Sequence, residues 1–150
     1  MKRTAFSLAL FLFITTQAFA HCQIPCGIYD DEARLKLISE HITTIEKSMK
    51  SIIELSAAKV IDYNQVVRWV NNKETHATYI QDIVSEYFMY QRLTPVARSD
   101  AKLYADYIDQ LTLLHQIGVY AMKTKQGLDL SSVQKLRQLL GSFKKAYFKK

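Results

Sequence analysis

The sequence predicts an all-α fold, an antiparallel up-down four-helix bundle, in a chain of 150 residues. Apolar residues recur at steps of three and four over four long stretches, which is the spacing of amphipathic helices. The chain has only four glycines and two prolines, so it offers few of the breaks that a turn-rich β architecture needs. No stretch alternates between apolar and polar residues for long enough to require a sheet. Short connections between the four stretches favour antiparallel neighbours.

The first predicted helix is capped by Asp30 or Asp31 and runs to about Ala58. Its apolar stripe consists of Ile38, Ile42, Ile45, Met49 and Ile52. The second predicted helix begins at Asp62 and ends before Pro95, because proline does not continue a helix. The residues that we expect to face inward on it are Val66, Trp69, Val70, Ala77, Ile80, Val84, Tyr87 and Phe88.

The third predicted helix is capped by Ser99 or Asp100 and stops at Gly127. Its expected inward residues are Leu103, Tyr107, Ile108, Leu111, Leu114, Gly118, Ala121 and Met122. The fourth predicted helix begins at Ser131, and its expected inward residues are Val133, Leu136, Leu140, Phe143 and Tyr147. Residues 30–150 are therefore expected to form one bundle domain.

The first twenty residues differ from the rest and have the pattern of a secretory signal peptide. They combine a basic start at Lys2 and Arg3, an apolar run over residues 5–14, and the small-residue cleavage site Ala18-Phe19-Ala20. The apolar run is shorter than the ~20 residues that a membrane-spanning helix needs, although a retained membrane anchor is the alternative. We expect cleavage after Ala20, export to the periplasm or beyond the cell, and no membrane attachment of the mature chain.

The net charge of +6 includes two positive charges, Lys2 and Arg3, within this removable segment. The other basic residues are scattered and no nucleic-acid-binding motif occurs, so no nucleic-acid partner is expected. A mild positive charge can attract small anions, and it also serves solubility alone.

Residues 21–29, HCQIPCGIY, hold both cysteines of the chain. A disulfide is the first interpretation in an exported protein, but a loop this short gains little stability from closure. Cleavage before His21 would instead free an α-amine beside the amide and thiol of Cys22, and Cys26 can complete a square-planar set. Such nitrogen and sulfur ligands suit Ni(II) or Cu(II), with the His21 imidazole as an axial ligand. A redox enzyme, a protein that sequesters nickel or copper, and a metal-free disulfide all remain open on these residues.

This segment resembles the nickel hook of the nickel-dependent superoxide dismutases, whose mature chains begin H-C-x-x-P-C-G-x-Y. The Thr44–Lys47 and Ser85–Phe88 stretches are also similar to family sequence. The resemblance implies a four-helix bundle, a homohexamer, one nickel ion per subunit and superoxide as the substrate. It implies conversion of superoxide to dioxygen and hydrogen peroxide through a Ni(II)/Ni(III) cycle.

The resemblance also implies roles for individual residues of the hook. His21, Cys22 and Cys26 would be the metal ligands, and Tyr29 would stand over the open face, order water and admit only small anions. Two positions depart from the family pattern. Gln23 stands where many members carry aspartate. Counted from the hook, Lys36 is the nearest match to a family glutamate that hydrogen-bonds the axial imidazole. Glu32 and Glu40 are the other candidates for that glutamate's role.

Three histidines and an aromatic group lie on predicted helices outside the hook. His41, His76 and His115 have no convincing metal-ligand spacing, so they are expected at an interface or in the core. Tyr87, Phe88 and Tyr90 are expected to pack in the core or between subunits, and the resemblance leaves open that Tyr87 helps to wall the site.

Overall fold

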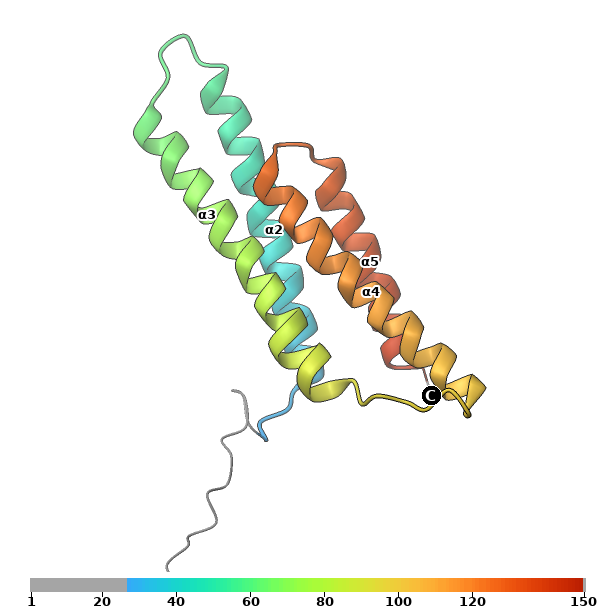
Figure 1. Ribbon diagram of the computed structural model, residues 1–150. Coiled ribbons are helices and arrows are strands. Elements are labelled where there is room, and N and C mark those ends of the chain that lie inside the picture. The colour runs from blue at the N-terminus through green and yellow to red at the C-terminus, as the bar shows by residue number, and fades with distance from the viewer. Residues whose placement is uncertain (1–26, 150) are drawn as a thin grey trace, which may run out of the picture.

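The computed structural model describes residues 27–149, within which four long helices pack in antiparallel contacts (Figure 1). These helices are α2 (Asp31–Ser56), α3 (Tyr63–Asp82), α4 (Ala101–Gln126) and α5 (Ser131–Tyr147). A π-helix, η1 (Ile83–Arg92), continues directly from α3. The α2–α3 hairpin packs against the α4–α5 hairpin through contacts of α3 with α4 and of α2 with α5. The predicted four-helix bundle is therefore confirmed, while hook residues 21–26 lie outside the described residues.

Three of these helices begin at an aspartate that the sequence predicted as a cap. The Asp30 carboxylate accepts a hydrogen bond from the backbone N–H three residues on, at 2.9 Å. Asp62 and Asp100 accept the equivalent bonds at the starts of α3 and α4. Each bond satisfies a backbone N–H that has no partner within its helix. Asp30 therefore sets the first residue of α2.

The core runs through the bundle and draws on all four helices and on η1. Its residues include most of the predicted stripe positions, because the three- and four-residue spacing places them on one face of each helix. The buried apolar residues are Leu35, Ile38, Ile42, Ile45, Met49, Ile52, Ala77, Ile80, Val84, Tyr87, Phe88, Leu93, Leu114, Ile117, Ala121, Val133, Leu136, Leu139 and Phe143.

The sequence predicts one continuous helix up to Pro95, whereas the structure widens its last ten residues into η1. The backbone N–H of Leu93 donates to the carbonyl of Phe88 at 2.9 Å, a bond that spans five residues. Tyr87 and Phe88 are neighbours in sequence, and both are buried in this wider turn. π-Helical turns are rare and occur frequently at functional sites. This end of the bundle is therefore a candidate location for the functional site.

Three residues of α4 that were expected to face inward are exposed, so that part of the prediction is wrong. Leu103 is 54% exposed, Ile108 is 39% exposed and Met122 is 43% exposed. Leu103 lies in the first turn, beside the open connection after η1, while the other two lie off the buried stripe. That stripe consists of Leu114, Ile117, Ala121 and Thr124.

The first half of α3 is less buried than expected, since Val66, Trp69 and Val70 are only partly covered. Lys73, in contrast, is buried, and its ammonium donates to the carbonyls of Lys125 at 2.7 Å and Gly127 at 3.4 Å. A cation at the carboxyl end of α4 complements the helix dipole and its unpaired carbonyls. No helix within residues 27–149 is long and apolar enough to cross a membrane.

Candidate functional site

Only one of the four predicted site residues lies in the part of the chain that the structure describes. The predicted nickel ligands His21, Cys22 and Cys26 lie outside the described residues, and Tyr29 lies within them. Gly27 has a φ of +70°, a left-handed backbone conformation that glycine adopts without strain. The chain therefore turns directly after Cys26, at the residue type that permits it.

Tyr29 is held against η1, at the end of the bundle where α2 begins. The Arg92 guanidinium lies 4.5 Å from the centroid of its ring, within the range of a cation–π contact. Its hydroxyl donates a long hydrogen bond of 3.5 Å to Oε1 of Gln91, and its ring meets the Tyr87 ring edge-on at 6.0 Å. Tyr29 is 47% exposed, so the ring has one packed side and one side open to solvent.

Asp31 is the centre of the hydrogen-bond network beneath Tyr29. Its Oδ1 accepts from the Tyr87 hydroxyl at 2.6 Å and from Nε of Arg92 at 2.8 Å. Its Oδ2 accepts from Nη2 of Arg92 at 2.8 Å and from the Tyr147 hydroxyl at 2.9 Å. One carboxylate thus joins the first turn of α2 to η1 and to the last turn of α5.

The network also sets the protonation of its members. Burial alone would raise the pKa of Asp31, but hydrogen bonds from Arg92, Tyr87 and Tyr147 outweigh it and hold that pKa below its ordinary value. Burial, together with the hydrogen bond to Asp31, raises the pKa of Tyr87 to about 12 and also raises the pKa of Tyr147. The bond to Asp31 raises the pKa of Arg92. Near neutral pH the network is one ion pair with two protonated phenols, so both phenols donate to Asp31.

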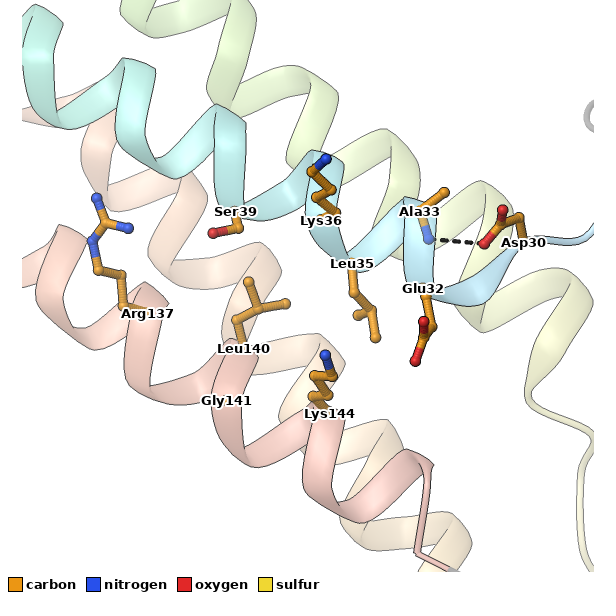
Figure 2. Close-up of a pocket in the computed structure, with 10 residues that line it drawn as sticks. All are labelled: Asp30, Glu32, Ala33, Leu35, Lys36, Ser39, Arg137, Leu140, Gly141 and Lys144. Carbon is orange, nitrogen blue, oxygen red and sulfur yellow. Dashed lines mark hydrogen bonds between the residues drawn. The ribbon is translucent and has the colours of Figure 1, made fainter.

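The candidates for the family glutamate's role lie elsewhere on α2. Glu32 and Lys36 line an open groove between α2 and α5, together with Arg137 and Lys144 (Figure 2). Glu40 is exposed one turn further along the same helix. Tyr29 hydrogen-bonds to Gln91 on η1, and the His21 imidazole that this glutamate would bind lies outside the described residues.

Two of the three helical histidines form a pair. Nδ1 of His41 on α2 lies 2.9 Å from Nδ1 of His76 on α3, so one ring donates and the other accepts. Burial lowers the pKa of both rings, and repulsion by His76 lowers that of His41 further. His115 is exposed. Within residues 27–149, no three His, Cys, Asp or Glu residues gather as a metal site.

Sequence reasoning missed three members of the Tyr29 site. It treated Asp31 only as a possible helix cap, and it assigned no role to Arg92. Tyr147 was expected in the core, where it packs against Phe88, but its hydroxyl also reaches Asp31. Arg92 and Tyr147 lie 61 and 116 residues from Asp31, and no local spacing could have joined them.

The comparison with protein families identifies the chain. The family model for nickel-containing superoxide dismutase matches residues 16–150, which include the complete hook and all four helices. No curated protein and no solved structure matches the chain. The matched range also includes Tyr29 and the network around Asp31. The chain therefore belongs to the nickel-containing superoxide dismutase family.

Proposed function

We propose that the mature chain holds nickel through the α-amine of His21, the amide nitrogen and thiolate of Cys22, and the thiolate of Cys26. Membership of the family supports the activity itself, which is oxidoreductase chemistry. Two superoxide anions and two protons give one dioxygen and one hydrogen peroxide. The observation that carries the proposed ligand set is the family match over residues 16–150, since that range contains all three residues.

The chemistry of the donor set fits nickel. Two nitrogens and two thiolates from one short segment suit the square-planar preference of Ni(II). When bound, nickel supplies the one-electron chemistry by alternating between its divalent and trivalent states. The thiolates and a deprotonated amide carry negative charge, which favours the higher oxidation state. The His21 imidazole would supply a further nitrogen ligand.

The described residues next to the hook support this placement. Gly27 provides the turn after Cys26. Nε of Arg34 and Oε2 of Glu86 are buried and have no hydrogen-bond partner within residues 27–149. The Arg34 guanidinium lies 5.2 Å from the centroid of the Tyr87 ring, and Glu86 precedes Tyr87 on η1. A hook folded against this end of the bundle would meet one free donor and one free acceptor, because buried polar groups normally have partners.

Tyr29 is the proposed catalytic residue of the hook. It follows Cys26 by three residues, so its Cα lies within about 11 Å of the Cys26 Cα. Its ring is held on one side by Arg92, and its hydroxyl keeps capacity for a second hydrogen bond because the bond to Gln91 is long. A half-exposed phenol in this position would order water over the nickel and admit only small anions such as superoxide.

Export and site assembly depend on the same cleavage in this proposal. Cutting the Ala20–His21 bond removes residues 1–20 as a signal peptide and frees the amine that binds nickel. The mature enzyme is then an exported protein, periplasmic or secreted.

We also propose that the subunits assemble as a homohexamer, as the family resemblance implies. Several large apolar side chains on α3, η1 and α4 are exposed in the single chain and are available to contact other subunits. Those on these helices are Tyr63, Val67, Tyr79, Tyr90, Leu103, Ile108 and Met122. Light scattering on the size-separated mature protein gives the subunit number directly, and a monomeric mass would contradict the assembly.

The ligand set is tested with three mature proteins: the chain beginning at His21, the same chain with one glycine added before His21, and Cys22→Ser. We expect one nickel per subunit and full activity only in the first, because the added glycine turns the amine into an amide. Cys22→Ser removes a thiolate. Electron paramagnetic resonance of the first protein should show trivalent nickel with nitrogen hyperfine splitting.

Either variant retaining full nickel and full activity would contradict the proposed ligand set. A protein that binds nickel but shows neither trivalent nickel nor turnover would be a sequestering protein, which would contradict the proposed enzyme.

A further inference from the structure

Within residues 27–149, Arg92 makes a closer contact with the Tyr29 ring than the Tyr87 ring does. The guanidinium packs on the ring at 4.5 Å from its centroid, whereas the hydrogen bond from the Tyr29 hydroxyl is long at 3.5 Å. The ring contact with Tyr87 is edge-on and more distant, at 6.0 Å. Of these three contacts, the one with Arg92 holds the Tyr29 ring most closely.

Arg92 is itself fixed by Asp31. Two of its nitrogens, Nε and Nη2, donate to the two oxygens of the Asp31 carboxylate, both at 2.8 Å. This fork-to-fork arrangement sets the plane of the guanidinium as well as its position. The side chains are only 30% and 16% exposed, so water competes weakly with the pair. Hydroxyls from Tyr87 and Tyr147 hold the carboxylate in turn.

The pair acts through geometry rather than through charge. The positive charge of Arg92 is balanced by Asp31 at hydrogen-bond distance, so the pair offers little net field to an approaching anion. What remains is a flat cation held in one plane, with the Tyr29 ring on its face. A lysine at position 92 would keep the charge but lose both the fork and the flat stacking surface.

We propose that Arg92, oriented by Asp31, is a positioning residue that fixes the Tyr29 ring and the chain segment joining the hook to α2. This inference rests on the proposed function where it places Tyr29 over the nickel. The placement of Tyr29 itself depends only on described residues.

The first test uses the nickel-free chain and measures nitration of Tyr29 by tetranitromethane, located by peptide mass. Arg92→Lys is compared with Arg137→Lys, a matched control whose arginine pairs with Glu46 at 2.7 Å on the outer faces of α5 and α2. Because Tyr29 is 47% exposed, losing its packed side should raise its nitration rate by up to about twofold. Tyr63, 71% exposed at the start of α3, serves as the internal reference and should not change.

The second test measures nickel release to a chelator in a double-mutant cycle. Arg92→Lys should speed nickel release about five- to tenfold when Tyr29 is present. That is the effect expected when the cation–π contact with Tyr29 and the paired hydrogen bonds to Asp31 are lost. It should cause no further change in a Tyr29→Ala chain, because the contact that it breaks is already gone.

Three results decide the inference. Equal Tyr29 nitration in Arg92→Lys and Arg137→Lys would overturn it. An equal effect of Arg92→Lys in the Tyr29 and Tyr29→Ala chains would also overturn it, since Arg92 would then act on general stability. Faster Tyr29 nitration in a chain whose wild type binds no nickel through Cys22 would support the positioning role and would contradict the proposed function instead.

Discussion

Replacing Asp31 by asparagine should destabilise the bundle more than loss of a charge from an exposed ion pair of residues 27–149. The substitution keeps the size of the side chain but removes the charge opposite Arg92. It also replaces one acceptor oxygen with an NH2 group, which cannot accept a hydrogen bond. Two of the four bonds are then lost: those from Tyr87 and Nε of Arg92 if Oδ1 is replaced, or those from Nη2 of Arg92 and from Tyr147 if Oδ2 is replaced.

The magnitude follows from burial. Exposed ion pairs contribute about 0–1 kcal/mol, and breaking a fully buried pair costs about 3–5 kcal/mol. Asp31 and Arg92 are 16% and 30% exposed, which places this pair between the two limits. We expect Asp31→Asn to lower the free energy of unfolding by about 2–3 kcal/mol at pH 7.

The effect should depend on pH in a defined direction. The pKa of Asp31 in the folded chain lies below its ordinary value of 3.8, so the folded state binds fewer protons there than the unfolded state. The stability that Asp31 contributes is therefore present above about pH 3.8 and is lost as the pH falls through the folded pKa. The difference between wild type and Asp31→Asn should shrink at acid pH.

Urea titrations at pH 7 and at pH 3 measure both expectations. Asp106→Asn is the matched control, since Asp106 pairs with Lys149 at 3.7 Å and the two side chains are 44% and 72% exposed. That control should change the free energy of unfolding by less than about 1 kcal/mol. The reasoning is refuted if Asp31→Asn at pH 7 costs no more than Asp106→Asn.

Two further predictions concern other parts of the bundle. Lys73→Met removes the ammonium that donates to the carbonyls at the carboxyl end of α4. It should lower the free energy of unfolding by about 1–3 kcal/mol in a urea titration. An unchanged urea midpoint would show that the carboxyl end of α4 needs no cation. Burial lowers the pKa of both His41 and His76 below 6.5, so the unfolded chain binds more protons and stability should fall as the pH drops below 6.5. In His76→Gln, the melting temperature between pH 7.5 and pH 5 should fall less steeply, and an identical slope would contradict this account.

The helices were predictable because their signals are local. The caps at Asp30, Asp62 and Asp100 and the three- and four-residue spacing each act within a few turns. The exposure of Leu103 was not predictable, because it depends on how the first turn of α4 lies against the rest of the bundle. The π-helical form of η1 was not predictable either, since it depends on two adjacent aromatic residues sharing the core.

The candidate site likewise has one part that local sequence predicts and one part that depends on the fold. The hook ligands and Tyr29 were predicted from nine consecutive residues, because their chemistry lies in a short segment. The Asp31–Arg92 pair was missed, because it needs the turn into α2, the end of η1 and the end of α5 to meet in space. Asp31 carried a local signal, that of a helix cap, and this concealed its longer-range role.

The most direct test of the account is the intact mass of the exported protein, recorded under native conditions without added metal. The account predicts a chain that begins at His21 and carries one nickel per subunit, with the nickel lost when the protein is unfolded in acid. A mature chain that begins at any other residue, or one whose two cysteines form a disulfide without nickel, would contradict the central claim.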